Sequence, residues 1–179
     1  MPPTFKTWLG ELLKQNTYNV NKLLNDNTAL HFLIAWSLFE SKCFKGDFVA
    51  RDIPRYALRI VEDASNDILL IRQHTQHFHV RYQDEIHREN MVPERTPKNI
   101  REKWEECLRI PFEDLSLEQA VFLGTFVASR FRNNMFHGVK GIDDWLYSRP
   151  EIILCTEILQ ILVSLAEAQN PTLLTQDAA

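Results

Sequence analysis

The chain has 179 residues, of which 45% are hydrophobic and 25% are charged. That composition is typical of a folded globular domain and excludes a disordered, collagen-like or low-complexity chain. Lys and Arg total 20 against 24 Asp and Glu, so the net charge is −4 and the surface as a whole does not attract polyanions.

The order of helix signals predicts an all-α fold. Only 5 glycines occur, and no stretch alternates polar and apolar residues as a strand does. The predicted helices are, in chain order, a peripheral helix within residues 1–20, an apolar core helix over 28–43, a helix from 52 to 64, one or two helices over 66–90, a short helix from 97 to 108, and two long apolar helices over 120–136 and 152–168.

Two capping patterns mark the starts of the long apolar helices. Ser116-x-x-Gln119 and Ser148-x-x-Glu151 both fit the capping box, in which two side chains bond each other's backbone N–H groups. The helix over 152–168 is apolar nearly all round. It therefore has to be buried, either within the bundle or in a dimer interface.

The helices predict one helical bundle that occupies the whole chain, residues 1–179. Pro93 and Pro97 mark the clearest loop, a proline-bearing insertion near residues 90–100. We expect residues 170–179 to form a frayed tail.

Cysteine usage and the N-terminus bear on the compartment. Cys43, Cys107 and Cys155 are odd in number and form no C-x-x-C pair, which disfavours a disulfide scaffold and fits a reducing compartment. The first ten residues lack the apolar stretch of a signal peptide, and the chain lacks an 18-residue apolar run. We therefore expect a cytoplasmic protein that does not enter a membrane.

Basic residues gather around one histidine late in the chain. Arg130, Arg132 and Lys140 flank His137, and residues 120–141 contain no acid. A guanidinium presents a forked set of donors that matches phosphate oxygens. An imidazole titrates near neutral pH and can transfer a proton. Together these groups can cleave an RNA backbone through its own 2′-hydroxyl.

Helical spacing predicts how these residues share the site. Asn133 and His137 are four residues apart and lie on one helix face, so the amide can orient the imidazole. Arg132 and His137 are five apart, about 140° around an ideal helix. They can serve one phosphate if the helix ends between them, as Gly138 suggests, or if a second subunit completes the site.

The motif Arg132-Asn133-x-x-x-His137, followed by Gly138, resembles the R-x4-6-H signature of the HEPN superfamily. HEPN domains are small all-α bundles in which this motif lies on a late helix, with a further apolar helix after it. The predicted helix order of this chain is similar. The resemblance implies a HEPN-like bundle and a metal-independent endoribonuclease that acts as a homodimer with a composite active site.

By the same resemblance, Arg132 stabilises the phosphate, His137 is the general acid and base, and Asn133 orients the ring. The substrate is RNA, no metal or cofactor takes part, and the protein is a toxin or an antiviral defence effector. The alternative is a catalytically silent HEPN-like module that binds a partner protein, such as a nucleotidyltransferase-type antitoxin.

Three further residues are candidates for substrate binding. Arg130 and Lys140 flank the motif and can contact an RNA backbone, although solvated side chains are the alternative for both. Glu40 is an isolated acid on the helix over 28–43 and can either enter the cleft beside Arg132 or mark the solvent-exposed end of that helix.

Four histidines between residues 74 and 87 allow a metal site to be considered: His74, His77, His79 and His87. Zinc requires three or four converging ligands, whereas His77 and His79 lie about 200° apart on a helix. A half-exposed helix with polar histidines is the preferred interpretation.

Overall fold

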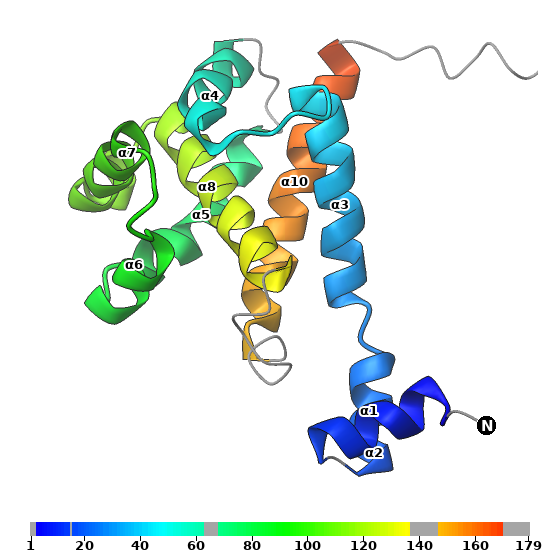
Figure 1. Ribbon diagram of the computed structural model, residues 1–179. Coiled ribbons are helices and arrows are strands. Elements are labelled where there is room, and N and C mark those ends of the chain that lie inside the picture. The colour runs from blue at the N-terminus through cyan, green and yellow to red at the C-terminus, as the bar shows by residue number, and fades with distance from the viewer. Residues whose placement is uncertain (1–2, 15, 63–67, 137–146, 170–179) are drawn as a thin grey trace, which may run out of the picture.

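The computed structural model describes residues 3–14, 16–62, 68–136 and 147–169 (Figure 1). All regular structure within these ranges is helical, which confirms the all-α prediction. The α-helices are α1 (Phe5–Leu13), α2 (Thr17–Leu24), α3 (Thr28–Phe44), α4 (Ile53–Glu62), α5 (Ile68–Arg81), α6 (Glu85–Met91), α7 (Lys98–Arg109), α8 (Leu117–Phe136) and α10 (Arg149–Gln169). Short 3-10 turns at Ala50–Asp52 and Phe112–Asp114 precede α4 and α8.

Most predicted boundaries agree with these helices, and the N-terminal region differs. The prediction for residues 66–90 left open one helix or two. The segment over 66–90 is two helices, because the backbone turns at Tyr82–Asp84 and the Asp84 carboxylate caps α6 through the His87 N–H at 3.0 Å. The N-terminal region also contains two helices rather than one. Asn16 caps α2, its side-chain oxygen accepting from the Asn19 N–H at 2.9 Å.

Helix α8 lies at the centre of the bundle, where α4, α5 and α10 pack against it, and α7 contacts it from a further side (Figure 1). Ten consecutive residues, Ala120–Ser129, are all buried. Gly124 permits the closest approach, since a Cβ atom there would meet Ile158 Cδ1 at 3.0 Å and Thr75 Oγ1 at 3.1 Å. The absence of a side chain at Gly124 thus lets both α5 and α10 pack closely against α8 at this residue.

The capping box at the start of α8 is formed as predicted. The Gln119 side-chain oxygen accepts from the Ser116 N–H at 2.9 Å, and Ser116 Oγ accepts from the Gln119 N–H at 3.1 Å. This reciprocal pair fixes the first turn of α8.

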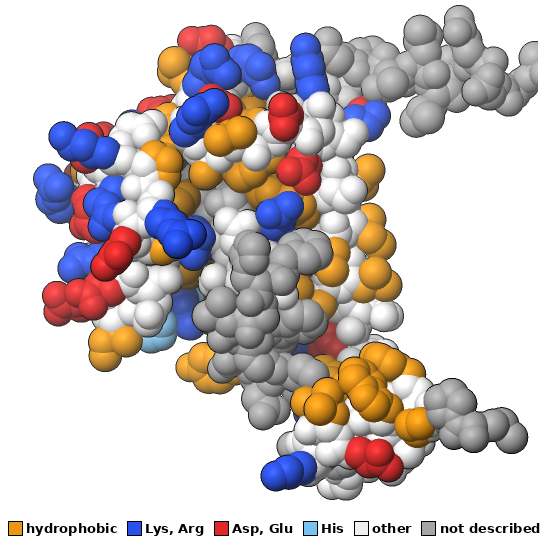
Figure 2. Space-filling model, viewed as in Figure 1, with side chains coloured by type: hydrophobic (Ala, Val, Ile, Leu, Met, Phe, Trp, Pro, Cys, Tyr) orange, Lys and Arg blue, Asp and Glu red, His pale blue; other side chains and the backbone are white. Residues whose placement is uncertain are grey.

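Helix α10 packs against α3, α8 and α5, so the bundle itself accounts for its apolar sequence. Helix α3 is less central than predicted, since Leu30, Ile34 and Leu38 on its outer side are about half exposed. Figure 2 shows these apolar side chains along the edge formed by α3, and further ones over the α1–α2 pair.

The α1–α2 pair projects beyond the start of α3 and packs mainly on itself (Figure 1). The connection to α3 is held by Asp26, whose carboxylate accepts from the Thr28 N–H at 2.8 Å and pairs with Arg149 Nε at 3.1 Å. Hydrogen bonding to Thr28, with a smaller contribution from Arg149, lowers the pKa of Asp26 below its usual value. One carboxylate thus ties the start of α3 to the start of α10.

The three cysteines are buried and unpaired. Burial raises the pKa of the Cys43 thiol to about 11 and that of Cys107 to about 12, and raises that of Cys155 as well. These thiols are therefore neutral and unreactive in the folded chain. Across the described helices, none has both the length and the apolarity needed to cross a membrane.

Candidate functional site

Arg132 lies near the end of α8, three residues beyond the buried segment Ala120–Ser129. Its Nη1 donates to the side-chain oxygen of Asn133 at 3.0 Å. Its guanidinium carbon lies 5.8 Å from the ring centroid of Trp36 on α3. The aromatic face and the amide together hold the fork of donors in a fixed plane, an arrangement suited to a phosphate.

Trp36 was not predicted as a site residue. Its ring is buried between α3 and α8, and its sequence context, an apolar helix, indicates only a core residue. The distance of almost one hundred residues between Trp36 and Arg132 leaves no local pattern that would identify the pair. Only the folding of α3 and α8 against α10 brings them together.

Asn133 makes a contact that differs from the predicted one. Its carbonyl oxygen is engaged by Arg132, so the amide positions the guanidinium. The predicted contact with His137 lies outside the described residues, as do His137 and Lys140 themselves. Helix α8 is described as far as Phe136, the residue immediately before the histidine.

Arg130 and Arg132 point in different directions, because two residues on a helix are about 200° apart. Arg130 is half-buried, and its Nε has no hydrogen-bond partner among the described residues. The loss of hydration lowers the pKa of its guanidinium, as expected when a charge is removed from water without a compensating anion. Arg130 therefore does not join Arg132 on one face of α8.

Glu40 lies on α3 one helical turn after Trp36 and is half-buried. It therefore occupies the face of α3 that carries the ring over which Arg132 lies. Its backbone oxygen also accepts from the Gly46 N–H at 2.9 Å, which closes the C-terminal end of α3.

The four histidines of the 74–87 segment each have a separate partner. His74 lies 3.4 Å from Glu157, His77 lies 3.4 Å from Glu151, His79 lies 3.0 Å from the Ile110 carbonyl oxygen, and His87 lies 2.8 Å from Asp84. No group of three or more His, Cys, Asp or Glu side chains in the described part of the chain is placed to hold a metal ion. His74 and His77 join α5 to α10, and His79 joins α5 to the residue after α7. His87 contacts the capping residue of its own helix, α6.

A buried ionic cluster between α5 and α10 was not predicted from the sequence. Glu151 in the first turn of α10 is buried and pairs with Arg81 at 2.9 Å as well as with His77. The predicted capping box with Ser148 does not form, because the Glu151 carboxylate turns to Arg81 and His77 on α5. Its second oxygen has no hydrogen-bond partner among the described residues. The sequence signal was an acid in the first turn of an apolar helix, which a capping pattern also explains.

Comparison with known proteins finds no protein-family model, no curated protein and no solved structure that matches this chain. The resemblance to the HEPN superfamily therefore rests on the motif that begins at Arg132 and on the helical architecture.

Proposed function

We propose that the protein is a metal-independent endoribonuclease of HEPN-like architecture. The observation that carries the proposal is the placement of Arg132. A buried helix supports it, Asn133 and Trp36 hold its guanidinium, and His137 follows five residues later in the sequence. This pairs a fixed phosphate-binding fork with a group that transfers protons at neutral pH.

In the proposed reaction, the 2′-oxygen of a ribose attacks the adjacent phosphorus and the bond from phosphorus to the 5′-oxygen breaks. A base removes the 2′-proton, and an acid supplies a proton to the departing 5′-oxygen. His137 fills these roles, and Arg132 stabilises the charge that builds on the non-bridging oxygens. The products are a 2′,3′-cyclic phosphate and a 5′-hydroxyl.

One imidazole cannot accept and donate in the same step, so we further propose a homodimer in which two motifs share one cleft, one histidine as base and the other as acid. A two-fold axis would bring the two ends of α8 together. The buried, apolar character of α8 and α10 does not contribute to this proposal, because contacts within the chain already account for it.

The test is cleavage of an end-labelled single-stranded RNA in the presence of EDTA. We expect cleavage at ribonucleotides and none at positions where the 2′-hydroxyl is replaced by hydrogen. His137→Ala should lower the rate by a factor of about 10² to 10⁴. His31→Ala, at an exposed histidine on α3, is the matched control.

Cleavage that EDTA abolishes and magnesium restores would contradict this mechanism. So would a His137→Ala variant that folds normally and cleaves at the wild-type rate.

One observation favours the alternative, a catalytically silent module that binds a partner protein. The exposed apolar residues of α3 lie away from the site, since Ile34 and Leu38 are each about 160° around the helix from Trp36. Exposed apolar side chains along one helix face are typical of protein-binding surfaces. If expression arrests growth and His137→Ala does not relieve the arrest, while Ile34→Glu does, this alternative is the better account.

A further inference from the structure

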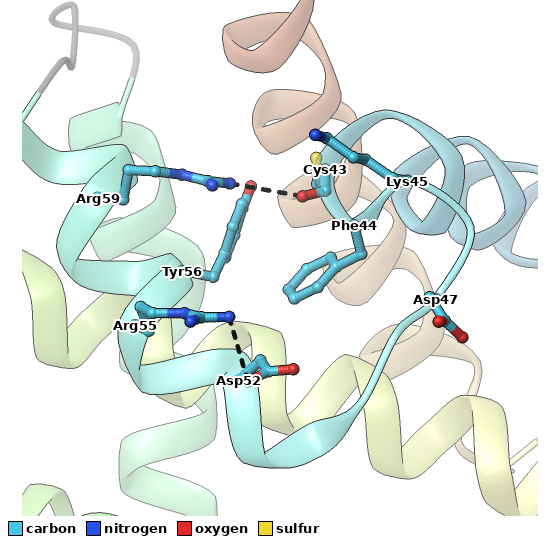
Figure 3. Close-up of a pocket in the computed structure, with 8 residues that line it drawn as sticks. All are labelled: Cys43, Phe44, Lys45, Asp47, Asp52, Arg55, Tyr56 and Arg59. Atoms are coloured by element: carbon cyan, nitrogen blue, oxygen red, sulfur yellow. Dashed lines mark hydrogen bonds and ion pairs between the residues drawn. The ribbon is translucent and has the colours of Figure 1, made fainter.

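A groove lies where the end of α3 faces the first half of α4 (Figure 3). It consists of two adjoining cavities of about 450 and 510 Å³ that share Cys43, Lys45, Tyr56 and Arg59. We call it the α3–α4 groove. Its size suits a small polar molecule or a single nucleotide unit of a longer chain.

Part of the positive charge in the groove is not paired with an acid of the described residues. Arg55 is paired with Asp52 at 3.4 Å at its lower edge. Arg59 donates instead to the Cys43 carbonyl oxygen at 3.5 Å and lies over the Tyr56 ring at 5.7 Å, both of which are neutral groups. No carboxylate of the described residues forms an ion pair with Arg59 or with Lys45.

Figure 3 shows how these groups are arranged. The Arg59 guanidinium and the Lys45 ammonium group extend over the same side of the groove as the Tyr56 hydroxyl, whereas the Asp47 carboxylate is directed away from them. On a protein with a net charge of −4, two cations that converge in this way form a local site for an anion.

Tyr56 supplies the second, independent observation. Its side chain is only 3% exposed, yet its hydroxyl makes no well-formed hydrogen bond to any residue that the structure describes. The Cys43 thiol is a polar neighbour of the hydroxyl and at most a weak hydrogen-bond partner, and burial keeps both groups protonated by raising their pKa values. A buried hydroxyl without a partner is uncommon, and a bound acceptor would satisfy it.

An aromatic wall adjoins these donors. The rings of Phe44 and Tyr56 lie 4.8 Å apart, and ring contacts continue from Phe44 through Phe48 to Trp36 at 5.0 and 4.8 Å. Trp36 is the ring over which Arg132 lies. The groove and the candidate site are therefore joined by one continuous aromatic cluster.

We propose that the α3–α4 groove binds the phosphate group of a nucleotide, with Arg59 and Lys45 as charged donors, the Tyr56 hydroxyl as a neutral donor, and Phe44 as an apolar flank for the sugar or base. A tetrahedral phosphate presents enough acceptor oxygens for all three donors. The phosphate belongs either to a free mononucleotide or to an RNA strand that continues from Arg132. The proposal does not depend on ribonuclease activity.

The test is calorimetric titration of the purified full chain with adenosine 5′-monophosphate, adenosine, and a single-stranded RNA of eight nucleotides. We expect the nucleotide or the RNA to bind and adenosine to bind at least ten-fold more weakly. Arg59→Gln should weaken binding at least ten-fold. Arg51→Gln, at an exposed arginine outside the groove, is the matched control and should bind as the wild type does.

Tyr56→Phe separates a binding role from a structural one. Removal of an unpaired buried hydroxyl should leave the unliganded protein as stable to urea as the wild type or more stable, while phosphate binding weakens several-fold. A loss of stability together with unchanged binding would overturn the proposal.

The two ligands identify the source of the phosphate. Binding of the mononucleotide that Arg59→Gln weakens supports a free nucleotide, and an effect of this variant on RNA alone supports an RNA strand. If neither ligand binds at millimolar concentration, or if Arg59→Gln changes neither, the proposal is wrong. Because binding is measured without cleavage, this outcome is independent of the His137→Ala result.

Discussion

Two arginines separated by one residue on α8 have different electrostatic surroundings. Arg132 has an aromatic ring beneath it and an amide oxygen at 3.0 Å, and both contacts orient its guanidinium. Arg130 differs in its loss of hydration, which lowers the pKa of its guanidinium. Because these contacts orient the Arg132 guanidinium, we propose Arg132 as the residue that binds the phosphate.

Variants of Asn133 test how Arg132 is positioned. Asn133→Ala removes one hydrogen bond to the guanidinium and should lower kcat/KM for RNA cleavage about ten-fold, much less than His137→Ala. Asn133→Asp keeps the acceptor oxygen but adds a negative charge beside the phosphate, so it should lower kcat/KM further. Asn134→Ala, at the next residue, is the control. Wild-type activity in Asn133→Asp would argue against phosphate binding at Arg132.

Arg132→Lys tests whether the shape of the guanidinium, and not only its charge, is needed. Lysine keeps the charge but has neither the planar face that lies on Trp36 nor the fork that donates to two oxygens. We expect a fall in kcat/KM of about 10² while the unfolding midpoint in urea stays close to that of the wild type. Full activity in this variant would mean that charge alone is sufficient.

Asp26 should make stability depend on pH. Its pKa is lowered in the folded chain, so its contribution is complete above the unfolded-state value of 3.8 and disappears as the pH falls through the folded-state value. Asp26→Asn keeps an acceptor oxygen but removes the charge that pairs with Arg149, so it should cost up to about 1 kcal/mol of unfolding free energy at pH 7 and less at pH 3. Urea unfolding at both pH values measures this, with the exposed Asp114→Asn as control. An equal cost at both pH values would contradict the assignment.

At the scale of helices, two matching sequence patterns had different outcomes. Ser116-x-x-Gln119 forms its capping box, because Glu106 on α7 accepts from the Gln119 side-chain nitrogen and leaves the side-chain oxygen for the Ser116 N–H. Glu151 has the same spacing from Ser148, yet Arg81 and His77 on α5 attract its carboxylate. A local pattern predicts the local structure only where no distant charge competes.

Local and distant interactions also differ in how well the sequence predicts them. Apolar periodicity and proline positions predicted α3, α4, α7, α8 and α10, because these signals lie within each helix. The partnership of Arg132 with Trp36 and the α3–α4 groove depend on which helices become neighbours. The choice of neighbouring helices depends on the whole chain. The sequence therefore identified the motif that begins at Arg132 but not the Trp36 ring that lies against it.

Gly124 sets the spacing of three helices. A glycine inside a helix normally costs about 1 kcal/mol relative to alanine, but here a Cβ atom would press on Ile158 and Thr75. The two effects should nearly cancel in Gly124→Ala, whereas Gly124→Val should lower the unfolding free energy by about 2 kcal/mol or more. Urea unfolding followed by circular dichroism measures both variants. A Gly124→Val variant as stable as the wild type would mean that α5 and α10 can move apart freely.

At the scale of the whole molecule, the exposed apolar side of α3 is opposite the face that carries Trp36 and Arg132, and the α1–α2 pair projects beyond the start of α3 (Figure 1). An apolar strip of this kind favours association with another protein surface. The proposed composite active site, in contrast, requires contact near the end of α8. The two surfaces therefore make separable predictions.

Ile34→Glu combined with Leu38→Glu should abolish any association through α3, because both side chains would carry charge into the contact. Sedimentation velocity over a range of concentrations should show the loss, while RNA cleavage stays at the wild-type rate. Ser37→Glu, at an exposed position on the same helix, is the control. Cleavage that disappears together with association would place the active-site contact on α3 instead.

The buried run Ala120–Ser129 also determines where amide hydrogens exchange with deuterium. Amides in this stretch are shielded from solvent on every side, so they should exchange only when the whole bundle unfolds. The amides of α1 and α2, which pack mainly on each other, should exchange through local opening within a much shorter time. Arg130–Asn134 continue the same helix where burial decreases. Slower exchange that RNA induces in this last stretch alone would identify a binding site whose support is already rigid before the substrate arrives.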